Sequence, residues 1–108
     1  MKMSIVTGIY SDMTEDKEFA KLLKAVARKK PVATGLFVVT RPLYDAGIME
    51  IYDYNELLQP FYRKKKQRLD IIGISKSRDG AKEIVKNIID DMYDKLGTIN
   101  VTEFFNLR

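Results

Sequence analysis

Leu69 to Gly97 reads LDIIGISKSRDGAKEIVKNIIDDMYDKLG, and this stretch carries the clearest structural signals in the chain. Its opening, residues 69–75, is mostly apolar and rich in isoleucine, which predicts a largely buried strand. From Ala81 to Leu96, apolar side chains recur every three or four residues and would share one face of a helix. Glycine is favoured just beyond the end of a helix, and Gly97 stands there. The sequence therefore predicts a strand, a short loop and a long helix.

A similar unit is predicted near the start of the chain. Residues 3–10 form a mixed apolar run that favours a short strand. A helix is expected from about Thr14 to Lys30, because apolar residues recur at helical spacing and Pro31 follows. Residues 33–40 contain Leu-Phe-Val-Val, which is typical of a buried strand.

The remaining segments complete the expected order of elements. Residues 48–54 alternate imperfectly between apolar and polar side chains, which favours a strand at a sheet edge. A short helical turn at 56–59 would follow. Residues 99–105 are predicted to form the last strand, so that strand, helix and strand occur twice, at 3–40 and 69–105.

We therefore predict a single α+β domain over residues 1–108. The expected architecture is a two-layer sandwich, in which a mixed or antiparallel sheet carries both long helices on one face, because each helix has a single apolar stripe. Two strand–helix–strand units on one sheet are typical of a ferredoxin-like βαββαβ arrangement. The segment at about 44–62 would be an insertion into that pattern.

The composition excludes several kinds of chemistry, because the 108 residues include neither cysteine nor histidine. Disulfides, thiolate nucleophiles, the usual structural zinc sites and a Ser-His-Asp triad are all excluded. No catalytic motif is recognisable, so we expect no enzyme, no bound metal and no cofactor. There is also no apolar run of about 18 residues and no secretory pattern at the start. We therefore expect no membrane partner and a cytoplasmic location.

Positive charge is concentrated between residues 61 and 80, where seven basic residues stand against two acidic ones. Lysine and arginine bind phosphates by releasing counterions, and Phe61 and Tyr62 could stack on bases. The candidate nucleic-acid contacts are Arg63, Lys64, Lys65, Lys66 and Arg68. Alternatively, this segment is a solvated connector whose charges protect an exposed strand edge.

The loop between the buried strand and the long helix is a candidate anion site. Its residues are Ser75, Lys76, Ser77 and Arg78. Hydroxyl and backbone N–H groups at the start of a helix can bind an anion, and the two cations would assist. The alternative is ordinary capping, in which Asp79 occupies the positive end of the helix.

The segment 44–62 contains five of the eleven aromatic residues and adds apolar area beyond what the two helices and the sheet require. Exposed tyrosine-rich surface is typical of interfaces. The candidate interface residues are Tyr44, Met49, Tyr52, Tyr54, Leu57, Phe61 and Tyr62. We therefore expect a small non-catalytic interaction protein that forms a homodimer, with nucleic-acid binding and binding of a small anion as alternatives. A lid folded onto the same core would also explain the segment.

Overall fold

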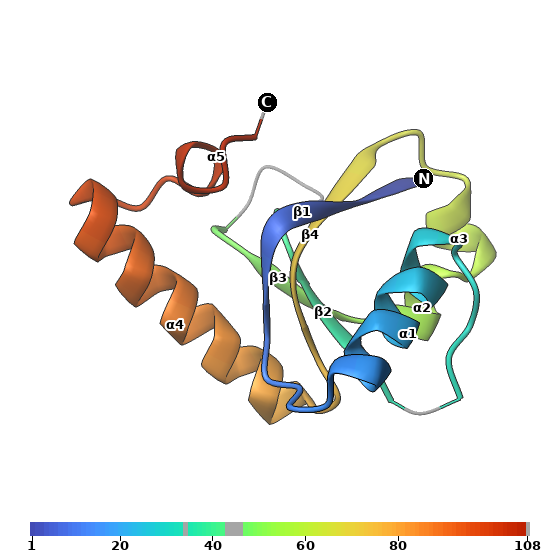
Figure 1. The fold of residues 1–108 in the computed structure, drawn as a ribbon. Helices are drawn as coiled ribbons and strands as arrows, with labels where there is room; N and C mark the ends of the chain where they lie inside the picture. Colours follow the sequence, from blue (N-terminus) through green and yellow to red (C-terminus); the bar gives the residue numbers. More distant parts are fainter. Residues whose placement is uncertain (34, 43–46, 108) are drawn as a thin grey trace.

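The computed structural model describes residues 1–33, 35–42 and 47–107, which form a small α+β domain (Figure 1). Its strands are β1 (Lys2–Ser11), β2 (Phe37–Thr40), β3 (Glu50–Asp53) and β4 (Arg68–Ser75). They form one mixed sheet in the order β1-β4-β2-β3. β1 is parallel to β4, whereas β2 is antiparallel to both β4 and β3.

The helices are α1 (Asp16–Ala27), α2 (Tyr54–Leu57), α3 (Pro60–Arg63), α4 (Arg78–Leu96) and α5 (Val101–Phe104). The predicted end of the long helix α4 at Gly97 is confirmed, whereas the helix begins at Arg78, before Ala81, and its N-cap is Ser77 rather than Asp79. The Ser77 hydroxyl accepts a hydrogen bond from Gly80 N at 2.9 Å, and Gly97 ends the helix with a φ of 70°. No helix in the described ranges combines the length and the apolar character needed to cross a bilayer.

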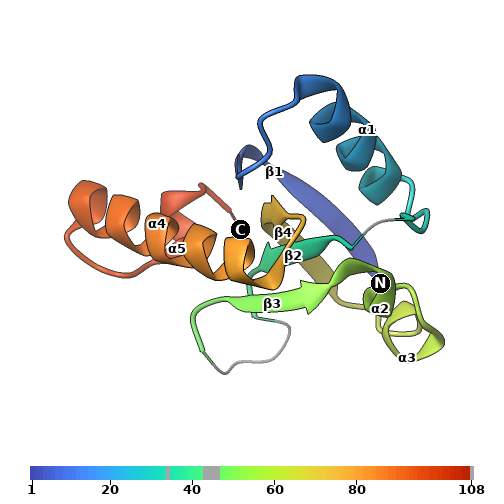
Figure 2. The same ribbon diagram turned by 90° about the horizontal axis from the view of Figure 1, so that it is seen from below.

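The two long helices lie on opposite faces of the sheet, so the prediction that they share one face is wrong (Figure 2). Adjacent residues of β2 show the division, because neighbouring side chains of a strand point to opposite faces. Val38 packs in one buried cluster with Leu22 of α1, whereas Val39 packs in another with Ile84 of α4. The two-layer sandwich and the ferredoxin-like arrangement are not confirmed.

The predicted last strand at 99–105 is also wrong, because this segment contains the short helix α5. The Asn100 side chain caps it by accepting a hydrogen bond from Glu103 N at 3.0 Å. Val101 is buried against the α4 cluster, and Phe104 and Phe105 pack around it. The second strand–helix–strand unit is therefore not completed.

β4 is the central element, and each of its residues from Leu69 to Ser75 is buried. Its pairing with β2 skips Ile72, because Val39 is opposite Gly73 and Thr40 is opposite Ile71. This β-bulge turns both Ile72 and Gly73 toward α4. A Cβ on Gly73 would lie 2.8 Å from Cγ2 of Ile84, so glycine allows α4 to pack closely on the strand.

Candidate functional site

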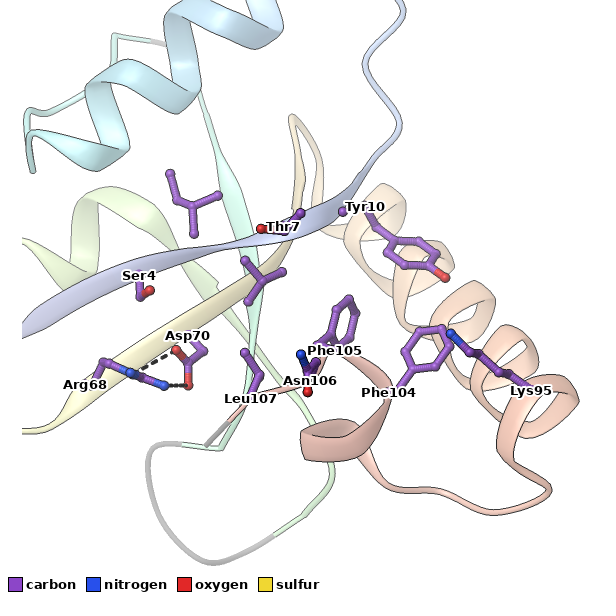
Figure 3. A pocket seen from close by; sticks show the side chains of 13 residues that line it. Ser4, Thr7, Tyr10, Arg68, Asp70, Lys95, Phe104, Phe105, Asn106 and Leu107 are labelled. Atoms are coloured by element: carbon purple, nitrogen blue, oxygen red, sulfur yellow. Dashed lines mark hydrogen bonds and ion pairs between the residues drawn. The ribbon is translucent and has the colours of Figure 1, made fainter.

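A hollow of about 780 Å³ lies on the α4 face, between the paired strands β1 and β4 and the segment around α5 (Figure 3). We call it the β1–α5 pocket. As the described residues form it, the pocket is open to solvent. Its lining residues are Ser4, Ile5, Val6, Thr7, Gly8, Tyr10, Arg68, Asp70, Lys95, Phe104, Phe105, Asn106 and Leu107. A volume of this size can hold a small organic molecule.

One wall of the pocket is aromatic. The rings of Phe104 and Phe105 are edge to face, with centroids 5.1 Å apart. Tyr10 extends the wall, since its ring centroid lies 6.1 Å from that of Phe105 in the same geometry. Lys95 stands at the rim, with Nζ 5.9 Å from the Phe104 ring centroid. The wall therefore offers apolar area with a cation at its edge.

The floor contains a buried carboxylate between two arginines. The Asp70 side chain is only 6% exposed. Its Oδ2 accepts a hydrogen bond from Arg41 at 3.1 Å, and its Oδ1 lies 3.0 Å from Nε of Arg68. That Nε–H group is not aligned for a hydrogen bond, so Oδ1 accepts none from the described residues. A second hollow of about 420 Å³ meets the pocket here and is lined by the same three charged residues and Pro42.

This arrangement is charged in a defined way. Two guanidinium groups around one carboxylate leave one net positive charge, which attracts an anion. The Arg68 side chain is 43% exposed, so it can still receive a ligand. Figure 3 shows Arg68 and Lys95 at opposite ends of the pocket, with the phenylalanines between them.

Tyr10 is held by α4 and does not ionise at neutral pH. Its hydroxyl donates a hydrogen bond to Oδ2 of Asp91 at 2.6 Å. Burial first, and then the hydrogen bond to Asp91 and its charge, raise the pKa of Tyr10 to about 12. The ring therefore contributes a neutral wall rather than a base. Among residues 1–33, 35–42 and 47–107, no three acidic side chains converge into a site that could hold a metal ion.

The predicted anion loop lies elsewhere, where the parallel strands β1 and β4 end. The Ser75 hydroxyl donates to Oδ2 of Asp12 at 2.7 Å, and Lys76 pairs with Glu18 at 2.9 Å. Arg78 covers the Phe37 ring, with 5.0 Å between its guanidinium carbon and the ring centroid. A hollow of about 380 Å³ adjoins this loop. Because the Asp12 carboxylate lies at the first turn of α4, an added anion would meet a like charge there. Anion binding at this loop stays a prediction.

The predicted basic contacts are divided by the structure. Arg63 ends α3, and Lys64, Lys65 and Lys66 lie in the connection to β4. Arg68 instead belongs to the floor of the β1–α5 pocket. Their contact with nucleic acid stays a prediction.

Two of the predicted interface residues are core residues. Tyr54 and Leu57 are 0% exposed, so their assignment to an interface is wrong. The physical reason is that α2 closes the α1 side of the sheet, where the Tyr54 hydroxyl donates to the Lys30 carbonyl at 2.8 Å. Burial raises the pKa of Tyr54 as well.

The other predicted interface residues differ in exposure. Met49, Tyr52 and Tyr62 are half-buried, and Phe61 is 66% exposed. Tyr44 lies outside the described residues. Whether these side chains meet a second copy stays a prediction.

Sequence reasoning missed the residues that form the pocket. One signal was present: Asp70 is the single charged residue between Leu69 and Ser75, and a buried charge needs partners. Arg41, Tyr10 and Phe105 carry no comparable signal, because only the fold brings them to the same face as Asp70.

Comparison with known proteins gave no match to this chain among family models, curated proteins or solved structures.

Proposed function

We propose that this domain is a non-catalytic binding protein for a small organic anion, held in the β1–α5 pocket. The observation that carries the proposal is the Asp70 carboxylate between the Arg41 and Arg68 guanidinium groups, because this cluster has one more positive than negative charge and the Arg68 side chain is 43% exposed. A bound anion would balance that charge by pairing with the exposed part of Arg68.

The chemistry of the pocket defines the ligand class. An anionic group would pair with Arg68. An apolar body would lie on Phe104 and Phe105. A carboxylic acid with an aromatic side chain meets both requirements. N-acetylphenylalanine is a simple probe of this class.

The absence of catalysis is proposed from the same residues. Tyr10 is neutral and donates to Asp91, and Asp70 is paired with cations. Neither is free to move a proton to or from a bound molecule. The pocket therefore offers binding groups without an acid–base pair.

Titration of the isotope-labelled chain with N-acetylphenylalanine, followed by amide NMR, tests the proposal. We expect shifts confined to residues that line the pocket, Arg68 and Phe105 among them. The uncharged amide of the same molecule should bind about tenfold more weakly or worse, because it lacks the charge that pairs with Arg68.

Variants separate this site from general attraction of anions. Arg68→Gln should weaken binding by about tenfold or more, whereas Lys64→Gln removes an exposed charge outside the pocket and should leave it unchanged. Equal affinity for the acid and its amide, or shifts spread over the whole surface, would rule the proposal out.

Self-association is a second candidate, supported by the edge of the sheet. β1 is ten residues long, and within the described ranges only β4 pairs with it. An unpaired strand edge favours pairing with a second copy. We expect a dimer in sedimentation velocity at micromolar concentration; a single monomeric species at every concentration would exclude it.

A further inference from the structure

We infer that the chain has a second binding surface, which takes single-stranded nucleic acid and lies where β1 begins. We call it the α1–α3 basic surface. Its cationic side chains are Arg28, Lys29, Lys30, Arg63, Lys64, Lys65 and Lys66. This surface is distinct from the β1–α5 pocket, because none of its seven cationic residues lines that pocket.

The fold assembles this surface from segments that are far apart in the sequence. Lys29 Nζ donates to the Met1 carbonyl, and Met1 N donates to the Arg63 carbonyl at 2.8 Å. The end of α1 and the end of α3 are therefore joined through the first residue of the chain. Figure 1 shows the N-terminus beside α3. The sequence alone presents two separate basic runs, and the fold brings them together through Met1.

The charge on this surface is available to a partner. Six of the seven side chains belong to exposed residues, and Lys65 is half-buried. Within the described part of the chain, Arg28, Lys30, Arg63, Lys64 and Lys66 form no ion pair with a carboxylate. Uncompensated cations attract a polyanion over several ångströms and gain free energy by releasing its counterions.

The molecule is polarised by this arrangement. Of 19 basic residues, seven lie on the α1–α3 basic surface, which leaves 12 basic and 15 acidic residues for the rest of the chain. The formal charge of +4 therefore understates the local positive field. A phosphate backbone would be drawn to this side and repelled by the remainder.

An exposed aromatic ring adjoins the cations and points to unpaired bases as the ligand. Phe61 is 66% exposed, and Tyr62 supports it from the side, with centroids 5.0 Å apart at 88°. Lys65 Nζ lies 4.7 Å from the Phe61 centroid. An aromatic platform beside cations is the arrangement on which the bases of a single strand stack.

Duplexes and membranes fit these residues less well. α3 has four residues, so it is too short to follow a major groove as a recognition helix does. A lipid surface would require a broad apolar face, whereas Phe61 is the only residue from Pro60 to Lys66 among the large exposed hydrophobics. Both partners are outcomes of the test.

Fluorescence anisotropy with a labelled 15-nucleotide oligothymidylate tests the inference on the full chain. We expect affinity to fall as salt rises, with a log–log slope of about −0.7 for each phosphate contacted. Phe61→Ala should weaken binding by about tenfold and leave the slope unchanged, because a stacking ring carries no charge.

A charge variant and a matched control locate the surface. Replacing Lys29, Arg63, Lys64 and Lys66 with Gln should flatten the slope and weaken binding at least tenfold. Replacing Lys17, Lys21, Lys82 and Lys86 with Gln removes the same charge from exposed positions elsewhere and should have a much smaller effect. Circular dichroism of both variants confirms that they fold.

Three results would overturn the inference. The first is an equal loss of oligonucleotide affinity in the two four-site variants, which would show that binding is not confined to the α1–α3 basic surface. The second is tighter binding to the duplex of the same sequence. The third is binding to vesicles of phosphatidylserine that is stronger than binding to the oligonucleotide and depends on the same residues.

Discussion

The two faces of the sheet are filled in different ways, although the same strand, β4, supplies both. On the α1 face, Leu69 and Ile71 lie in a closed cluster with Tyr54, whose hydroxyl donates to a backbone carbonyl. On the α4 face, Asp70 borders an open pocket and pairs with two arginines. One face therefore contributes packing, while the other retains polar groups that can bind a ligand.

The hydroxyl groups of two tyrosines show the same contrast. Tyr54 is fully buried and its partner is the neutral Lys30 carbonyl. Tyr10 is half-buried and its partner is the Asp91 carboxylate. The Tyr54 hydroxyl is therefore satisfied by backbone, whereas the Tyr10 hydroxyl is satisfied by a charged side chain. Mutations on each face should therefore differ in size and in their dependence on pH.

The largest effect is expected at Tyr54. Tyr54→Ala should lower the free energy of unfolding by about 3–5 kcal/mol, because it leaves a cavity in a closed cluster. Tyr54→Phe keeps the ring and should cost about 1 kcal/mol, since it removes only the hydroxyl, which donates to the Lys30 and Ala25 carbonyls. Urea unfolding measures both. A loss below about 1 kcal/mol for Tyr54→Ala would show that this face is not tightly packed.

A smaller effect is expected on the pocket side. Phe105→Ala should cost about 1–2 kcal/mol, because its ring is half-buried and borders space that solvent already reaches. The same urea titration compares it directly with Tyr54→Ala. If the two losses were equal, the contrast between a closed and an open face would be wrong.

The smallest effect is expected for Asp91→Asn, which should change the pKa of Tyr10. Asp91→Asn should lower the pKa of Tyr10 from about 12 while keeping it above 10, because burial is the larger cause of the shift. Carbon NMR of the tyrosine ring atoms follows each hydroxyl separately. Asp90→Asn, which removes the partner of Lys86 instead, is the control and should leave Tyr10 unchanged. An unchanged pKa in Asp91→Asn would mean that the contact with Asp91 does not form in solution.

The sign of the pH dependence follows from the same shift. The pKa of Tyr10 is raised on folding, so its contribution to stability is complete below pH 10, its value in the unfolded chain. It is lost as the pH rises from 10 through about 12. Removing the Asp91 carboxylate should therefore reduce the alkaline loss of stability, which urea unfolding at several pH values would record.

Local elements followed from the sequence more readily than their placement. The spacing from Ala81 to Leu96 predicted α4, and Gly97 predicted its end, because both depend on neighbouring residues. The apolar stripe of a helix shows that one side is covered but not which face of a sheet covers it. The shared face was therefore predicted wrongly.

Two further failures have equally specific causes. The apolar run at 99–105 is compatible with a strand or a helix, and the Asn100 cap selects the helix. The pocket depends on long-range contacts, since Tyr10, Asp70 and Phe105 line it together only after the sheet forms. Asp70 alone was conspicuous in the sequence, as a charge within a buried strand.

The bulge at Ile72 adds one residue to the central strand β4 relative to β2. In a regular strand, residues five apart point in opposite directions. Because of the additional residue, both Asp70 and Ser75 face the α4 layer; Asp70 lies at the pocket, and Ser75 lies beside Asp12 at the start of the helix. Deleting Ile72 would turn the side chains on one side of the deletion to the opposite face of the sheet. The bulge therefore determines that both polar side chains of β4 lie on the same face.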